Sequence, residues 1–352
     1  MDQKIIQRLE KAIAEKVFPG CILGIIWRDG FRKIFPVGNF TYEKDSPKVK
    51  EDTIYDLASV TKSIPTSCIL LKLIEEGKVD LEDTVLDFIP EFGNSLEKKS
   101  VTIKNLLTYT LELDVPPLSS LKDKNPDEIV DIVCKAPLKS IPGSKFFYNN
   151  GTALLIGLVI QKIIGESLDK YAEREFFVPL GMDRTTFQPQ RFLRAEIAPT
   201  EIDAWRGRVI QGEVHDESTF TLHKKYFFGI SGLFSTVPDT LNFQEMLLND
   251  GVKDDERYFS KSMIQKMHTN MMLGASGDPV GLGWNIYNPL YMGKKASSEV
   301  FGKTGFTGTL VLTDPVKGIG FTLLSNRTFP KRPKDSSAIN AVRGDIADII
   351  FA

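Results

Sequence analysis

Strand-like segments lie at both ends of this chain, and helical patterns fill the long stretch between them. Near the amino end, an amphipathic helix over 2–16 precedes apolar strands over 21–27 and 31–37, which the turn signal Arg28-Asp29-Gly30 joins. Near the carboxyl end, the pattern predicts four strands and a closing helix at 283–287, 299–303, 308–313, 318–325 and 335–351. The chain therefore indicates an α/β (α+β) fold, with one antiparallel sheet built from both termini and flanked by the terminal helices.

The middle of the chain places a helical region against that sheet. The predicted helices are 59–76, 102–109, 126–136, 151–164, 168–177 and 238–249. A length of 352 residues allows two domains or one large two-part unit with a cleft. Because both termini are needed for the sheet, we expect one domain over 1–352. Its sheet-containing part is 1–57 with 277–352, and its mainly helical part is 58–276.

The composition is that of an ordinary globular chain, with 42% hydrophobic and 26% charged residues. The 44 basic and 46 acidic residues leave a net charge of -2 and are interleaved, so no surface for nucleic acid is predicted. The three cysteines are an odd number and form no close pair, which makes a disulfide framework unexpected. The three histidines are scattered, so we expect no metal site and no cofactor.

The amino-terminal residues 1–10 carry charges throughout and lack the apolar stretch of a secretory signal. No segment reaches the roughly 18 uninterrupted apolar residues that a membrane-spanning helix requires. We therefore expect a cytoplasmic protein without a membrane span, or a periplasmic or extracellular one if a signal has been trimmed. The sequence leaves the oligomeric state open.

Three short strings carry the chemistry of this chain: Ser59-Val60-Thr61-Lys62, Tyr148-Asn149-Asn150 and Lys303-Thr304-Gly305. The first string means little alone, because a serine three residues before a lysine recurs at 95–98, 119–122 and 167–170. The Tyr-x-Asn and Lys-Thr-Gly strings each occur once. Together, in this order, the strings indicate a nucleophile, a base and an electrophilic clamp.

Ser59 and Lys62 would share one face of a helix that begins near Ser59. The lysine could then reach the serine hydroxyl, and the free N–H groups of the helix start would stabilise the oxyanion that follows attack. Apolar neighbours predict a buried lysine with a lowered pKa, which can take or relay a proton. The competing interpretation is a helix cap followed by a solvated lysine. Pro65 predicts a kink directly after this pair.

Tyr148 and Asn150 lie where an extended aromatic segment meets an apolar helix. Between two lysines, Tyr148 would have its phenolate form favoured and could act as a general base, while Asn150 could donate to a substrate carbonyl. Alternatively, Tyr148 is a core residue and Asn149 or Asn150 is only a helix cap.

Lys303, Thr304 and Gly305 end a predicted strand, and Gly305 has no side chain to obstruct a substrate beside it. Lys303 supplies charge for a carboxylate or for Tyr148, and Thr304 supplies a hydroxyl. The N–H of Phe306 could pair with that of Ser59 as an oxyanion hole. The competing interpretation is an edge strand that ends in a turn.

In order, spacing and setting, these strings resemble the serine β-lactamase and penicillin-recognising enzyme superfamily. Tyr-x-Asn in the second string is similar to class C β-lactamases, D-alanyl-D-alanine carboxypeptidases and family VIII carboxylesterases. The resemblance extends over nearly the whole chain, including segments 55–58, 181–182, 229–236 and 281–284. It implies a β-lactamase/transpeptidase-like fold with its active site in the cleft. It also implies that Ser59 is the acylated nucleophile, that Lys62 and Tyr148 are the general-base pair, and that Asn150, Lys303 and Thr304 bind substrate.

Two further loops bear on the site. The stretch that ends in Gly212-Glu213-Val214-His215-Asp216-Glu217 resembles β-lactamase-related and penicillin-binding proteins, and His215 and Asp216 either line the cleft or brace a local turn. Relatives usually read His-Thr-Ser-Gly-Leu where this chain has Tyr109-Thr110-Leu111-Glu112-Leu113. This bulkier, acidic version could narrow the site or change which substrates enter.

The leading hypothesis is a serine hydrolase that cleaves amide or ester carbonyls through an acyl-enzyme on Ser59. Its partner would be a small molecule or peptide with an ester, amide or lactam carbonyl. Lys303 favours substrates that carry a carboxylate, as β-lactams and D-alanyl peptides do. The alternatives are a family VIII-type carboxylesterase and a penicillin-binding or scaffold protein that does not turn over.

Overall fold

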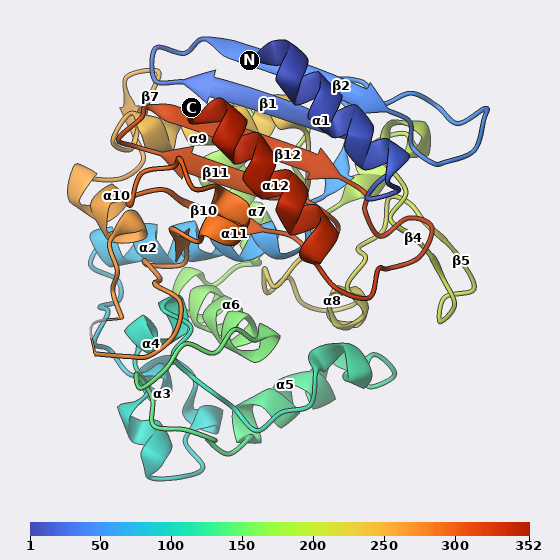
Figure 1. Ribbon diagram of the computed structural model, residues 1–352. Coiled ribbons are helices and arrows are strands. Elements are labelled where there is room, and N and C mark those ends of the chain that lie inside the picture. Colours follow the sequence, from blue (N-terminus) through green and yellow to red (C-terminus); the bar gives the residue numbers. More distant parts are fainter. Residues whose placement is uncertain (273) are drawn as a thin grey trace.

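A six-stranded antiparallel sheet forms the centre of the computed structural model, which describes residues 1–272 and 274–352 (Figure 1). The strand order is β2-β1-β12-β11-β10-β9. The strands are β1 (Gly20–Trp27), β2 (Arg32–Gly38), β9 (Asn285–Ile286), β10 (Phe301–Thr304), β11 (Leu310–Asp314) and β12 (Ile319–Ser325). Strands β1 and β12 join the two ends of the chain, with Cys21 opposite Ser325 and Trp27 opposite Ile319. The predicted sheet from both termini is confirmed.

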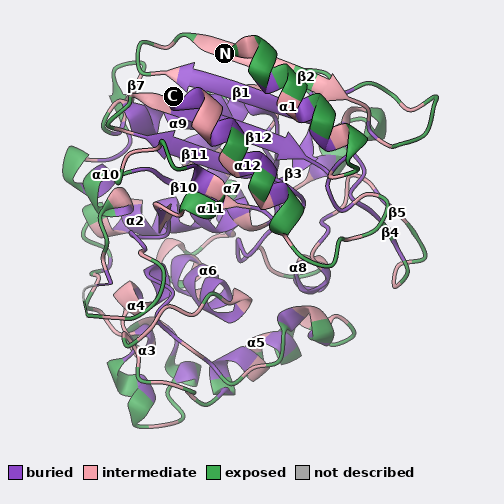
Figure 2. Ribbon diagram, viewed as in Figure 1, coloured by how far each residue is buried: buried purple, intermediate pink, exposed green. Residues whose placement is uncertain are grey.

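Helices cover both faces of the sheet. On one face, α1 (Asp2–Ala14) and α12 (Ser337–Ile350) pack their apolar residues against Leu23 and Ile25 of β1. The neighbouring residues Ile22 and Ile26 point to the opposite face, where α9 (Val237–Leu248) packs. Figure 2 shows β1 and β12 as buried strands between these layers, while the outer sides of α1 and α12 are exposed. The central strands of the sheet are therefore buried between two layers, while the edge strand β2 is partly exposed.

The helical part lies below the sheet in Figure 1, with α6 between the sheet and helices α3, α4 and α5. Its helices are α2 (Cys68–Glu75), α3 (Val85–Phe88), α4 (Ile103–Leu107), α5 (Pro126–Lys135), α6 (Asn150–Ile164) and α7 (Leu168–Ala172). The remaining short elements are α8 (Glu217–Leu222), α10 (Lys261–His268), α11 (Pro289–Met292) and the strand pairs β3 (Tyr55–Asp56) with β6 (Phe234–Ser235), β4 (Glu201–Asp203) with β5 (Arg208–Ile210), and β7 (Val252–Lys253) with β8 (Glu256–Arg257). The sequence pattern did not predict these, because such short elements depend on tertiary contacts.

The predicted helix over 59–76 is interrupted. Residues Ala58–Lys62 form a tight helical turn, Ile64 leaves helical geometry with φ -114° and ψ 110°, and the regular helix α2 begins only at Cys68. Pro65 has no N–H to donate to the Thr61 carbonyl. The Ser67 hydroxyl donates a hydrogen bond of 2.7 Å to the carbonyl of Lys62. The expected kink is present, and it separates the serine turn from α2.

No single helix among the described residues is long and apolar enough to cross a membrane. The pair that passes by length and composition, Asn150–Ile164 with Leu168–Phe177, is bent by 76°.

Glycines let the segment 228–230 pass between two helical elements. A Cβ atom at Gly157 of α6 would lie 2.3 Å from the carbonyl oxygen of Phe228, and one at Gly229 would lie 1.9 Å from the Thr66 hydroxyl oxygen. Gly229 also has a φ of 66°, which glycine adopts without strain. This close packing fixes the backbone of Ile230, whose carbonyl faces Lys62.

Substitution of Gly157 by alanine should destabilise the protein, although the same change inside a helix ordinarily stabilises it by about 0.5–1 kcal/mol. The added methyl group would press on the Phe228 backbone, and such overpacking costs about 1–3 kcal/mol. Thermal unfolding of Gly157→Ala and wild type measures the difference. An unchanged or raised melting temperature would contradict the expected contact.

Candidate active site

Ser59 and Lys62 are in direct contact. The Lys62 Nζ lies 3.0 Å from the Ser59 Oγ and 2.7 Å from the carbonyl oxygen of Ile230. Lys62 is only 2% exposed, whereas Ser59 is partly exposed and lines a cavity. The two acceptors hold the amine beside the hydroxyl, so this lysine is buried as expected and is not a solvated helix residue.

Tyr148 brings the second string to the same place. It lies before α6, is 41% exposed and lines the cavity with Ser59. Its ring faces two ammonium groups, with its centroid 5.4 Å from the Nζ of Lys62 and 4.8 Å from the Nζ of Lys303. The three strings therefore converge, although about 240 positions separate the first from the third.

Lys303 lies on β10 with only 2% of its surface exposed. Burial lowers the pKa of its amine well below the ordinary value, and the nearby charge of Lys62 lowers it further. Its Nζ donates a hydrogen bond of 3.1 Å to the hydroxyl of Tyr109. Among the described residues, no carboxylate forms an ion pair with it.

Residues Thr304, Gly305 and Phe306 line the same cavity, which has a volume of about 310 Å³. The space that a side chain at Gly305 would need is filled by the chain itself, because a Cβ there would lie 2.0 Å from the Thr309 hydroxyl and 2.3 Å from the Leu57 carbonyl oxygen. The glycine therefore allows the strand end to pack against the segment that carries Ser59. Gly305 also lines the cavity, so the expectation that a substrate lies beside it stays a prediction.

Asn150 is the first residue of α6, and the helix cap is Asn149, whose side chain accepts the N–H of Thr152 at 2.8 Å. Asn150 does not line the cavity that holds Ser59. It lines a neighbouring cavity of about 350 Å³, together with Tyr148 and apolar residues such as Leu113 and Leu118.

Two buried arginines form part of the cavity, and the sequence patterns predicted neither of them as a site residue. Arg343 of α12 donates hydrogen bonds to the carbonyls of Gly305 and Thr309, and Arg327 donates one of 2.7 Å to the carbonyl of Phe306. Burial lowers the pKa of Arg343 to about 9, and the charge of Arg327 adds to this effect. Neither arginine forms an ion pair with a carboxylate within the described part of the chain. One feature of the sequence could have indicated Arg343: it is a charged residue on the apolar face of the last helix.

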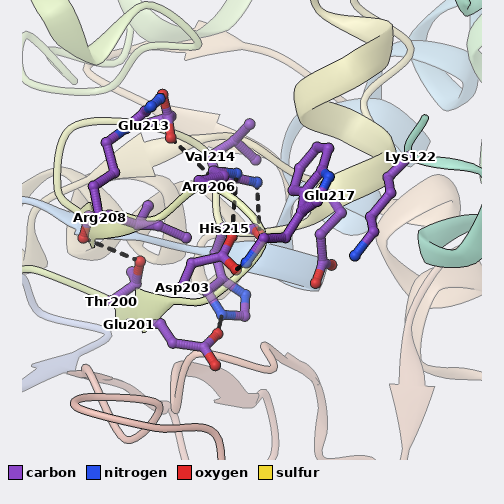
Figure 3. A network of polar contacts seen from close by, with 12 residues as sticks. Lys122, Thr200, Glu201, Asp203, Arg206, Arg208, Glu213, Val214, His215 and Glu217 are labelled. Carbon is purple, nitrogen blue, oxygen red and sulfur yellow. Dashed lines mark hydrogen bonds and ion pairs between the residues drawn. The ribbon is translucent and has the colours of Figure 1, made fainter. Parts of the chain in front are cut away.

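His215 and Asp216 do not line this cavity. The His215 ring stacks on Phe306 with centroids 5.7 Å apart, and its Nε2 lies 2.7 Å from the Glu201 carboxylate (Figure 3). Asp216 caps α8 by accepting the N–H of Thr219 at 2.8 Å. The geometry is that of a local brace, with His215 behind the phenylalanine that lines the cavity.

A network of charges supports this brace. Arg332 donates hydrogen bonds to the carboxylates of Glu201 and Glu217, at 2.7 and 2.9 Å. The Arg206 side chain, which is 2% exposed, donates to the carbonyls of Val214 and His215, as Figure 3 shows. Burial acts to raise the pKa of Glu201, but the hydrogen bonds from His215 and Arg332 outweigh it and hold the pKa at about 2.

Metal-binding clusters of three or more histidine, cysteine, aspartate or glutamate residues are absent from residues 1–272 and 274–352.

We expect Glu201→Gln to destabilise the protein at neutral pH by about 1–3 kcal/mol, because it removes a charged acceptor from His215 and Arg332. A carboxyl with a depressed folded-state pKa stabilises the fold above its unfolded pKa, and this contribution is lost as pH falls. The difference from wild type should therefore shrink between about pH 4.5 and about pH 2. Thermal unfolding across this range measures it, with the exposed Glu10→Gln as control. A difference that stays constant with pH would contradict the ionised network.

Comparison with known proteins places these observations in a family. The chain matches the β-lactamase family over residues 5–343. It is 30% identical over 309 residues to a candidate D-alanyl-D-alanine carboxypeptidase of Escherichia coli K12, which covers 80% of this chain and 70% of that protein. A relative of the same description in Salmonella typhi is 30% identical over 318 residues, with coverage of 82% and 72%.

Solved structures share the fold. The hydrolase EstCE1, described as having promiscuous acyltransferase activity, superposes with a TM-score of 0.78 at 19% identity, covering 98% of both chains. An octameric penicillin-binding protein homologue from Pyrococcus abyssi gives a TM-score of 0.72 at 26% identity, covering 93% of this chain and 74% of that one. With the expected β-lactamase/transpeptidase-like fold confirmed, this chain belongs to the β-lactamase family of serine hydrolases.

Proposed function

We propose that Ser59 is the nucleophile of this serine hydrolase and that Lys62 and Tyr148 exchange its proton. The observation that carries this proposal is the 3.0 Å contact between the Lys62 Nζ and the Ser59 Oγ at the edge of the cavity. The Lys62 and Tyr148 pair, with Lys62 oriented by the Ile230 carbonyl, would accept the hydroxyl proton as the serine oxygen bonds to the substrate carbonyl carbon.

The collapse of the tetrahedral intermediate then breaks the bond to the leaving amine or alcohol, which takes the proton back from the Lys62 and Tyr148 pair. The product of this half-reaction is an acyl ester on Ser59. In the second half-reaction water attacks the ester and gives a proton to the same pair. The bond between the acyl carbon and the serine oxygen then breaks, the pair returns the proton to that oxygen, and the acid is released.

The N–H groups of Ser59 and Phe306 are the proposed oxyanion donors. Within the described residues, the N–H of Phe306 has no hydrogen-bond acceptor. Its peptide is held on both sides, because Arg343 binds the Gly305 carbonyl and Arg327 binds the Phe306 carbonyl. His215 supports the Phe306 ring from behind.

We infer further that the preferred substrates carry a carboxylate. The cavity is lined by Lys303, Arg327 and Arg343, and no aspartate or glutamate is among its described lining residues. An uncompensated positive cavity favours an anionic ligand, and arginine in particular suits a carboxylate. The relatives' description as candidate D-alanyl-D-alanine carboxypeptidases is consistent with such a substrate. A family VIII-type carboxylesterase is the second candidate function, because the neighbouring cavity beside Tyr148 is largely apolar.

We also propose that residues 1–352 act as one catalytic domain. The larger core is continuous from Ile22 and Ile26 in the sheet to Leu106 and Leu155 in the helical part.

An acylating probe tests the nucleophile. Intact-mass measurement after treatment with a β-lactam or a fluorophosphonate should show one adduct on the wild type and none on Ser59→Ala. Ser167→Ala is the matched control, because Ser167 also precedes a lysine by three positions but lies at the start of α7. An adduct that persists in Ser59→Ala would refute the assignment.

Substrate preference can be tested on the wild type. We expect an acyl-D-alanyl-D-alanine peptide or a chromogenic cephalosporin to exceed its own methyl ester in kcat/KM by about tenfold, since a hydrogen bond to a charged group contributes about 1.5–3 kcal/mol. Hydrolysis of p-nitrophenyl butyrate serves as the neutral reference. Equal rates for acid and methyl ester, with faster butyrate hydrolysis, would favour the carboxylesterase.

A further inference from the structure

Tyr109 contacts two residues of the site, Lys303 and Tyr148. It follows α4, is 1% exposed and has a φ of 53°, which turns the chain. Its carbonyl accepts the N–H of Phe147 at 2.7 Å, so its backbone is tied to the residue before Tyr148. The two tyrosine rings are 5.3 Å apart.

The hydroxyl of Tyr109 meets the amine of Lys303. The Nζ of Lys303 lies 3.1 Å from this oxygen, 4.2 Å from the centroid of the Tyr109 ring and 4.8 Å from that of the Tyr148 ring. Lys62 is the other charged group whose field acts on Lys303. In the described part of the chain, the phenol oxygen is the one hydrogen-bond acceptor for this buried amine.

An ammonium group with three N–H donors loses its hydration on burial, and its charged form then depends on the acceptors that the protein supplies. The ring faces contribute through their quadrupoles, but a phenylalanine at position 109 would keep its ring while losing the oxygen. The contribution of the Tyr109 hydroxyl can therefore be removed by substitution while that of the ring is kept.

We propose that Tyr109 is a positioning residue, whose hydroxyl keeps Lys303 charged and directed at Tyr148 in the acyl-transfer site. The proposal rests on the function proposed above. In this arrangement Tyr109 acts through Lys303 and does not touch the substrate, which agrees with its absence from the cavity lining.

The loop that carries Tyr109 therefore contacts the site through Lys303. Tyr109 points to Lys303, and Glu112 pairs with Lys145 at 2.7 Å. Whether the loop narrows the site or changes which substrates enter stays a prediction. Leu113 of the same loop lines the neighbouring apolar cavity.

The pH dependence of Tyr109→Phe tests the proposal. A hydrogen bond to the charged form of an amine favours that form, so its loss lowers the pKa of Lys303. Activity that needs charged Lys303 is lost as pH rises through this pKa, so the alkaline limb of kcat/KM should move to lower pH by about one unit. At the acidic end of the profile the variant should approach wild-type activity.

Tyr55→Phe is the matched control, because the Tyr55 hydroxyl is buried and has no hydrogen-bond partner among the described residues. A displaced alkaline limb in Tyr109→Phe with an unchanged limb in Tyr55→Phe supports the proposal. An unchanged limb in Tyr109→Phe, or an equal displacement in both variants, overturns it.

A second measurement does not depend on turnover. In protein labelled with carbon-13 at lysine Cε, the Lys303 signal, assigned by its loss in Lys303→Met, should titrate at lower pH in Tyr109→Phe than in wild type. Identical titrations overturn the proposal, even if the activity profile moves for another reason. Failure of Ser59 to be acylated would instead refute the proposed function and leave this titration result intact.

Discussion

Asp56 and Leu57 attach the segment that carries Ser59 to both parts of the molecule, and the geometry of the site depends on this attachment. The hydroxyls of Thr307 and Thr309 donate to the carbonyls of Asp56 and Leu57, at 2.7 and 2.9 Å. The Asp56 carboxylate accepts the N–H groups of Ala58 and His215. The turn that carries Ser59 is thereby bound to the segment between β10 and β11 and to the loop that carries His215. Through the hydrogen bond from Leu57 to Leu233 it is also bound to the segment that holds Lys62.

The second constraint is electrostatic. Lys62, Lys303, Arg327 and Arg343 are nearly buried around one cavity whose described lining contains no acidic side chain. Burial of cations without counter-ions is costly, and the protein offsets the cost with carbonyl oxygens, the Tyr109 hydroxyl and aromatic faces. These acceptors are neutral, so they do not cancel the positive charge around the cavity as a carboxylate partner would. This is the basis on which we propose a substrate that carries a carboxylate.

Much of the fold could be read from the sequence, because apolar period-2 and period-3.6 patterns mark long elements directly. The sheet from both termini, the terminal helices and the break after Lys62 followed from such patterns and from the chemistry of proline. The short pieces α8, α10 and α11 did not, since their residues are ordered by neighbours and not by local preference. The three strings similarly predicted Ser59, Lys62, Tyr148 and Lys303, and the structure brings these four side chains together.

By itself, the sequence determined the three strings and their order, which match the β-lactamase family, because residue types and local spacing are sequence properties. Only the tertiary structure decided what surrounds them. Tyr109 meets Lys303 across 194 positions, Arg343 meets Gly305 across 38, and His215 is turned away from the cavity toward Glu201. The physical reason is that the charge of a buried amine or guanidinium depends on acceptors supplied by other segments, and only packing determines which segments those are.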